Sequence, residues 1–215
     1  MVTISTIQYK DDFLQVLLDT SEALRIPYGV SGMFHLEAGK VVDPLEYQQL
    51  KEESDRFTCK RKAYDYLEVR NRSASELERS LSRKGFSKDI IREVIMDLQD
   101  RGYVDDYQYA LQFIRSKRRA KTIGDNLLRA ELNKRGVDRR LVAKALKNSR
   151  QDEPAFNDIY TLALKKAERV KAKKNPYGKV YQYLGQRGFE YEDIQKVMRR
   201  LKDDGLFDND YQDSI

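Results

Sequence analysis

The sequence predicts a mainly α-helical protein: three tandem three-helix repeats in an elongated curved array, preceded by a small β-containing N-terminal region. Three observations support this fold class. A helix–glycine–helix motif recurs at a nearly constant spacing, apolar residues within each copy follow a helical period, and strand-like alternation is confined to the N-terminus. The expected domains are residues 1–55, 56–106, 107–150 and 151–215.

The N-terminal region has the pattern of a hairpin. Residues 2–8 alternate β-branched and polar side chains, as a half-buried strand does, and residues 13–18 supply its partner across a polar turn at residues 10–12. Asp43 and Pro44 then open a short helix, because Asp caps helices well and Pro suits their first position. We expect a small acidic β-containing cap on a helical array.

The repeats are centred on Gly85, Gly136 and Gly188, which are 51 and 52 residues apart. Residues 85–105 and 188–208 are identical at 8 of 21 positions without a gap. Identity of this kind at a fixed offset does not readily arise by chance. The three copies are therefore tandem versions of one unit.

Each copy is expected to contain three helices. First helices are expected near residues 56–70, 106–120 and 154–173, and Ser73 with Glu76 forms a capping box that starts a second helix over 74–84. Gly85 fits the left-handed position that ends such a helix. The expected N-caps of the remaining helices are Ser87, Asp105, Asp138 and Asn175, while Asp208 would cap a helix beyond the third copy.

Composition excludes several classes of protein. No apolar run approaches the length of a membrane span, and the N-terminus lacks the pattern of a signal peptide. Cys59 is the only cysteine and His35 the only histidine, which leaves little material for metal sites or catalytic triads. We expect a cytoplasmic protein that is not an enzyme and holds no metal or cofactor.

Weak enzymatic alternatives have simpler explanations. Cys59 precedes two cations that could lower its pKa, but a buried, unreactive thiol is the favoured interpretation. The acidic pairs 105–106 and 203–204 could hold Mg²⁺, but helix capping explains the recurring Asp more simply. No phosphate-binding loop of the GxxxxGK[ST] type occurs in the sequence.

Charge is concentrated in the second repeat. Residues 107–150 carry 13 Lys+Arg and 3 Asp+Glu, a net of +10, against a net of +6 for the whole chain. Such a field favours a polyanionic partner, although a solvated helix surface is the alternative. The candidate binding residues are the clustered cations of the second and third repeats: Arg115, Lys117, Arg118, Arg119, Lys121, Arg139, Arg140, Lys144, Lys165, Lys166, Lys171, Lys173, Lys174 and Lys179.

The first repeat is less suited to nucleic acid. Its last helix carries Asp89, Glu93, Asp97 and Asp100 against two cations, so that phosphates would be repelled and a protein contact is favoured. Six tyrosines could stack on bases, but core packing is the favoured interpretation for them. They are Tyr103, Tyr107, Tyr109, Tyr177, Tyr181 and Tyr183.

The order of these motifs resembles the RecX regulatory protein family, the bacterial modulators of the RecA recombinase. The resemblance rests on residues 73–86, on residues 100–106 with Tyr109 and Ala110, and on residues 118–136 with Gly124 and the segment Glu131–Gly136. It covers about residues 60–210. The first 55 residues share only the character of a strand-bearing extension.

The resemblance implies a regulator that lies along the RecA–DNA filament and blocks its growth or promotes its disassembly. RecA's ATPase, strand-exchange and coprotease activities in recombination, repair and the SOS response would then fall. The expected partners are the RecA filament and, with weak to moderate, sequence-independent affinity, single- or double-stranded DNA. We expect a monomer with no membrane contact. The alternative is a stand-alone, sequence-tolerant DNA-binding protein.

Overall fold

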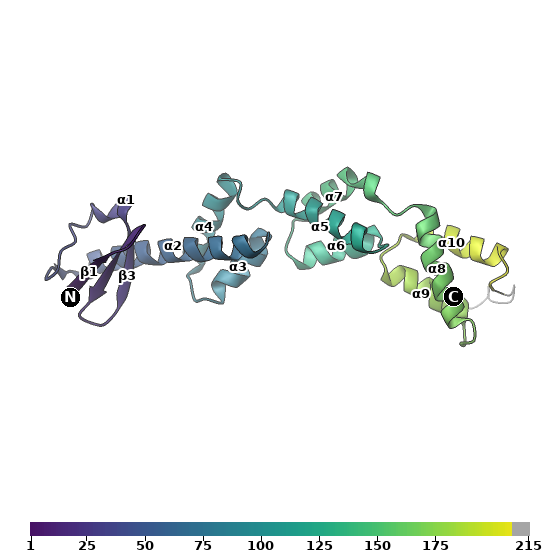
Figure 1. The fold of residues 1–215 in the computed structure, drawn as a ribbon, viewed down its shortest axis with the longest axis horizontal. Coiled ribbons are helices and arrows are strands. Elements are labelled where there is room, and N and C mark those ends of the chain that lie inside the picture. Colours follow the sequence, from purple (N-terminus) through teal and green to yellow (C-terminus); the bar gives the residue numbers. More distant parts are fainter. Residues whose placement is uncertain (208–215) are drawn as a thin grey trace. The chain divides into compact units, whose positions relative to one another are not determined.

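The computed structural model describes residues 1–207 and divides the chain into two compact units, before and after Val104 (Figure 1). The first unit contains the sheet and the first three-helix repeat. The second contains the other two repeats. The predicted role of Asp208 lies outside the described residues.

The N-terminal region is a four-stranded antiparallel sheet with strand order β3-β2-β1-β4. Its strands are β1 (Val2–Tyr9), β2 (Phe13–Leu18), β3 (Ala23–Pro27) and β4 (Val41–Val42), and a short helix α1 (Tyr28–Ser31) follows β3. The predicted hairpin is confirmed, because Ile7 pairs with Val16 and Tyr9 with Leu14. The inward-facing residues Ile4, Val16 and Ile26 are fully buried and form a core with Leu50.

One helix, α2 (Pro44–Val69), replaces the two separate helices expected here. Asp43 caps it as predicted, accepting from the backbone amides of Leu45 and Glu46. No proline or glycine interrupts the segment, so the helix continues from the sheet region into the first repeat. The boundary expected at residue 55 therefore falls inside α2, where Ser54 Oγ accepts from the amide of Arg25 in β3 at 2.8 Å.

The first repeat is completed by α3 (Ala74–Ser82) and α4 (Lys88–Asp100). The predicted caps are present, since Ser73 accepts from the amide of Glu76 and Ser87 from that of Ile90. The helical stripe of α4 lies against Leu77 and Leu81 of α3 and against Cys59 of α2. The core of this repeat is separate from that of the sheet.

The second unit contains two further three-helix repeats. Their helices are α5 (Asp106–Ala120), α6 (Asp125–Lys134) and α7 (Arg139–Asn148), then α8 (Phe156–Val170), α9 (Pro176–Gln186) and α10 (Tyr191–Asp203), with a 3₁₀ turn η1 (Arg150–Asp152) between the two sets. Asp105, Asp138 and Asn175 cap α5, α7 and α9 as predicted. The helical repeat architecture is thus confirmed in all three copies.

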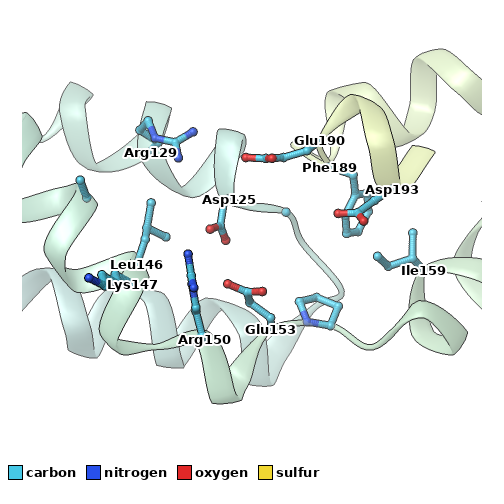
Figure 2. Close-up of a pocket in the computed structure, with 13 residues that line it drawn as sticks. Asp125, Arg129, Leu146, Lys147, Arg150, Glu153, Ile159, Phe189, Glu190 and Asp193 are labelled. Carbon is cyan, nitrogen blue, oxygen red and sulfur yellow. The ribbon is translucent and has the colours of Figure 1, made fainter. Parts of the chain in front are cut away.

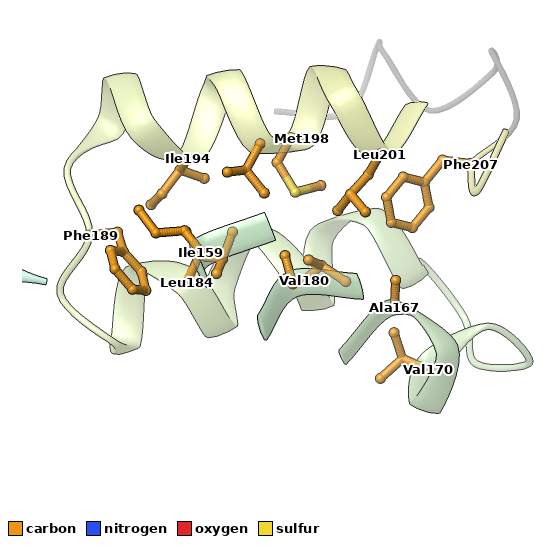
Figure 3. Close-up of a cluster of buried hydrophobic side chains, with 12 residues drawn as sticks. Ile159, Ala167, Val170, Val180, Leu184, Phe189, Ile194, Met198, Leu201 and Phe207 are labelled. Atoms are coloured by element: carbon orange, nitrogen blue, oxygen red, sulfur yellow. The ribbon is translucent and has the colours of Figure 1, made fainter. Parts of the chain in front are cut away.

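Each repeat has its own apolar core. Figure 3 shows that of the third repeat, where Ile194, Met198 and Leu201 of α10 face Val180 and Leu184 of α9. Most of the tyrosines that were considered for base stacking border such cores, and Tyr109 is only 8% exposed. Tyr103 is the exception. It is 59% exposed and packs edge-on against Tyr64 at 5.3 Å between ring centroids.

Candidate functional site

The predicted cations at the end of α5 divide into buried and exposed groups. The side chain of Arg118 is only 2% exposed, whereas Arg119 and Lys121 are exposed. Within the described part of the chain, neither Arg119 nor Lys121 forms an ion pair. The sequence placed Arg118 among the exposed binding cations, and its burial corrects this expectation.

Arg118 holds the second repeat together. One nitrogen, Nη1, donates to the carbonyl oxygen of Ser149 at 2.6 Å and to its hydroxyl at 3.1 Å, and Nη2 forms an ion pair with Asp125. These contacts join the end of α5 to the start of α6 and the end of α7. The sequence contains an indication of this burial, because Ala110, Ile114 and Arg118 are spaced i, i+4, i+8 along the buried stripe of α5.

Two further predicted cations of α5 have nearby acidic partners. Lys117 Nζ lies 2.6 Å from Glu131 Oε2 and 5.1 Å from the Phe113 ring centroid, and Arg115 Nε lies 3.7 Å from Asp152 Oδ2. Surface pairs of this kind contribute little to stability. Both side chains therefore retain the capacity to exchange an internal carboxylate for an external anion.

The basic residues of α7 occupy its solvent-facing side. Arg139 and Arg140 are exposed in the first turn, where the helix dipole disfavours cations, so local helix stability does not explain them. Lys144, one turn further, lies 4.8 Å from the ring centroid of Tyr107. This arrangement leaves the two arginines able to contact a polyanion.

In the third repeat, the predicted lysines surround the turn between α8 and α9. Lys171, Lys173 and Lys174 are exposed in this turn, and Lys179 Nζ donates to the carbonyl of Lys174 at 2.6 Å. The other two, Lys165 and Lys166, lie on α8, where Lys166 is 5.0 Å from the Tyr183 ring centroid. The turn can thus present several positive charges to one partner.

The second and third repeats are joined backbone to backbone. The amide of Gly124 donates to the carbonyl of Arg187 at 2.9 Å, and that of Asn126 to the carbonyl of Gly188 at 3.0 Å. The carbonyl end of α9 therefore satisfies free amides at the start of α6, an arrangement that also aligns opposite dipole ends. A Cβ on Gly124 would lie 2.2 Å from the Gly188 oxygen, so this approach requires glycine.

Beside this junction is a cleft of about 570 Å³ that the sequence did not reveal. Figure 2 shows Arg129, Lys147 and Arg150 on the second repeat and Glu190 and Asp193 on the third. None of the predicted binding residues lines it. Its walls come from two repeats, so residue spacing within one repeat could not identify it.

The surroundings of the residues considered for catalysis indicate structural roles. Burial, with a smaller contribution from Asp55, raises the pKa of the Cys59 thiol to about 12, which opposes a nucleophilic role. Asp105 caps α5, and Asp204 accepts from the hydroxyl of Tyr160 at 2.5 Å. Among residues 1–207, no cluster of three potential metal ligands occurs. No helix in this described part is long and apolar enough to cross a membrane.

Comparisons with known proteins agree with the repeat boundaries seen in the structure. The models for the first, second and third three-helix domains of RecX match residues 59–98, 105–146 and 152–198. Regulatory protein RecX of Pelodictyon phaeoclathratiforme is 33% identical over 150 residues, covering 69% of this chain and 91% of the relative. That of Bacillus licheniformis is 28% identical over 211 residues, covering 94% and 78%.

Solved structures show the same fold. A crystal structure of regulatory protein RecX superposes with a TM-score of 0.73 at 20% identity, covering 93% of this chain and all of the other. RecX from Lactobacillus salivarius superposes with a TM-score of 0.61 at 26% identity, covering 69% and 97%. With the three domains matched in order, this chain belongs to the RecX family of regulatory proteins.

Proposed function

We propose that this protein binds the RecA–DNA filament and inhibits its ATPase, strand-exchange and coprotease activities. The main support is the ordered match of all three RecX domains to one chain, since regulation of RecA is what the RecX resemblance implies. The net charge of +10 in residues 107–150 is consistent with a partner that contains DNA. The proposal requires no catalytic group on this chain.

The contact residues of this proposal are the predicted cations that remain accessible. Arg119 and Lys121 lie at the end of α5, and Arg139 and Arg140 open α7. The turn between α8 and α9 adds Lys171, Lys173 and Lys174. Each contact is weak alone. On one chain, however, such contacts add through effective concentration, so that a filament offering many sites is bound more tightly than any single site.

Direct binding tests the proposal. A fluorescently labelled form of the protein would be titrated with RecA filament assembled on oligo(dT), with oligo(dT) alone, and with oligo(dT) coated by an unrelated single-strand-binding protein. We expect the RecA filament to bind most tightly. Equal affinity for naked DNA and for the RecA filament would contradict a filament-specific role.

The second candidate is a sequence-tolerant DNA-binding protein that acts without RecA. The observation in its favour is that the exposed cations could neutralise phosphates without any protein contact. If about five phosphates of duplex DNA are contacted, log K falls with log salt at a slope of about −4 to −5. This candidate predicts tight binding to naked duplex and equal inhibition of any DNA-bound enzyme.

A further inference from the structure

The first repeat contains an arginine-lined cavity of about 510 Å³. All of its lining side chains are charged or carry a hydroxyl group: Arg70, Arg72, Glu76, Glu78, Arg79, Ser80, Ser82 and Arg83. Four positive and two negative charges give it a formal net charge of +2. It lies along α3, and its lining includes none of the candidate cations of the second and third repeats.

Two guanidinium groups in this cavity converge on a neutral hydroxyl. Arg72 Nη1 and Arg83 Nη2 each lie 3.4 Å from the Oγ of Ser80, which is 4% exposed and donates its own proton to the Glu76 carbonyl at 2.8 Å. Across residues 1–207, Arg72 and Arg83 form no ion pair with a carboxylate. Like charges brought together in this way attract an anion to the space between them.

Of the two carboxylates that line the cavity, that of Glu76 is already engaged by another arginine. Glu76 receives two bonds from Arg70, with nitrogen–oxygen distances of 3.0 and 3.3 Å. Arg72 is also held in place, because its Nε donates to the Tyr66 carbonyl at 3.2 Å and its guanidinium lies 4.9 Å from the Tyr66 ring centroid. The site is therefore partly preorganised before any ligand arrives.

We propose that this cavity binds a backbone phosphate of nucleic acid, giving the first repeat a DNA contact of its own. Arginine forks match phosphate oxygens, and serine hydroxyls commonly assist in contacts to the backbone. No apolar or aromatic side chain lines the cavity, whereas protein–protein contacts are usually centred on such groups. The proposal revises the view that only the second and third repeats face DNA.

The inference extends the proposed function, and its test contains no RecA, so each can fail without the other. Binding of the full-length protein to fluorescein-labelled single-stranded DNA would be measured as a function of salt. Arg83→Glu is compared with Lys84→Glu, a matched control: Lys84 is exposed, adjacent in sequence and outside the cavity. Arg79→Glu provides a second cavity variant, and thermal melting verifies folding.

We expect Arg83→Glu and Arg79→Glu to weaken DNA binding about tenfold and to reduce the magnitude of the salt slope by about 1, with less than a twofold change for Lys84→Glu. Arg83→Lys should fall between, since it keeps the charge but loses the fork. Equal weakening by the cavity and control variants would overturn the site. Arginine-dependent binding of polyglutamate or inorganic phosphate, but not of DNA, would overturn its assignment to nucleic acid.

Discussion

Gly85 of the first repeat and Gly188 of the third occupy equivalent places after the second helix of their repeats. Both have a left-handed backbone, with φ of +89° and +82°. A Cβ on Gly85 would meet no described atom within 4 Å, whereas one on Gly188 would lie 2.2 Å from the amide nitrogen of Leu127. Gly85 is thus required only for a turn. Gly188 is required for the equivalent turn and also for the close contact between the second and third repeats.

The largest effect is expected from replacing these two glycines by alanine. Gly188→Ala should destabilise the protein by about 4 kcal/mol, because the strain of left-handed alanine adds to overpacking against Leu127. Gly85→Ala should lose only about 1–2 kcal/mol, which is the backbone strain alone. Denaturant unfolding of both variants measures the difference. Equal losses would show that the contact of Gly188 contributes nothing to stability.

Replacing Arg118 tests the same junction from the second repeat, whereas Gly188 lies on the third. Arg118→Ala should cost about 3 kcal/mol, since it removes the partner of Asp125 and unpairs the buried Ser149 carbonyl. Asp125 follows Gly124 directly, so amide exchange at Gly124 and Asn126 should also quicken. A variant that keeps wild-type stability and exchange would contradict the structural role of Arg118.

Replacing exposed cations, in contrast to Arg118, should impair binding and not stability. Arg119→Glu combined with Lys121→Glu should leave the melting temperature nearly unchanged but weaken filament binding about tenfold or more, because two phosphate or carboxylate contacts become repulsive. The control is Lys88→Glu with Arg92→Glu, on the acidic α4 of the first repeat. Equal loss in the control pair would mean that net charge, not the position at the end of α5, governs binding.

The smallest effect concerns Cys59 in the core of the first repeat. Burial raises the pKa of the Cys59 thiol to about 12, so the folded state favours the neutral thiol. The contribution of this preference to the stability of the folded protein is complete below the ordinary thiol pKa and is lost as the pH rises toward 12. Alkylation at pH 8 should therefore be slow until the protein unfolds, and Cys59→Ala should decline less steeply in stability at alkaline pH. Rapid labelling of the folded protein would contradict this burial.

Local features of this chain were predictable from its sequence. The glycine turns, the caps at Ser73, Ser87 and Asp138, and the N-terminal hairpin follow from backbone preferences that act over a few residues. The continuation of α2 across residue 55 was missed because its apolar side chains contact the sheet at one end and helices at the other. No single amphipathic stripe therefore runs along its length.

The candidate surfaces depended on contacts between distant segments. Arg118 and Arg119 are neighbours in sequence, yet only the first reaches Ser149 and Asp125, so charge counting could not separate them. Likewise, Arg72 and Arg83 come from either end of α3 and meet only at Ser80. Sequence spacing located the basic regions but could not determine which cations remain accessible.

The proposed action of this RecX-family protein on RecA can be measured directly. The most direct test titrates it, well below the RecA concentration, into RecA's ATPase reaction on single-stranded DNA, beside an unrelated DNA-dependent ATPase. We predict that only the RecA reaction is inhibited, because binding to the filament and not occupancy of bare DNA is responsible. Equal inhibition of both enzymes, or inhibition of neither, would contradict a specific action on the RecA filament.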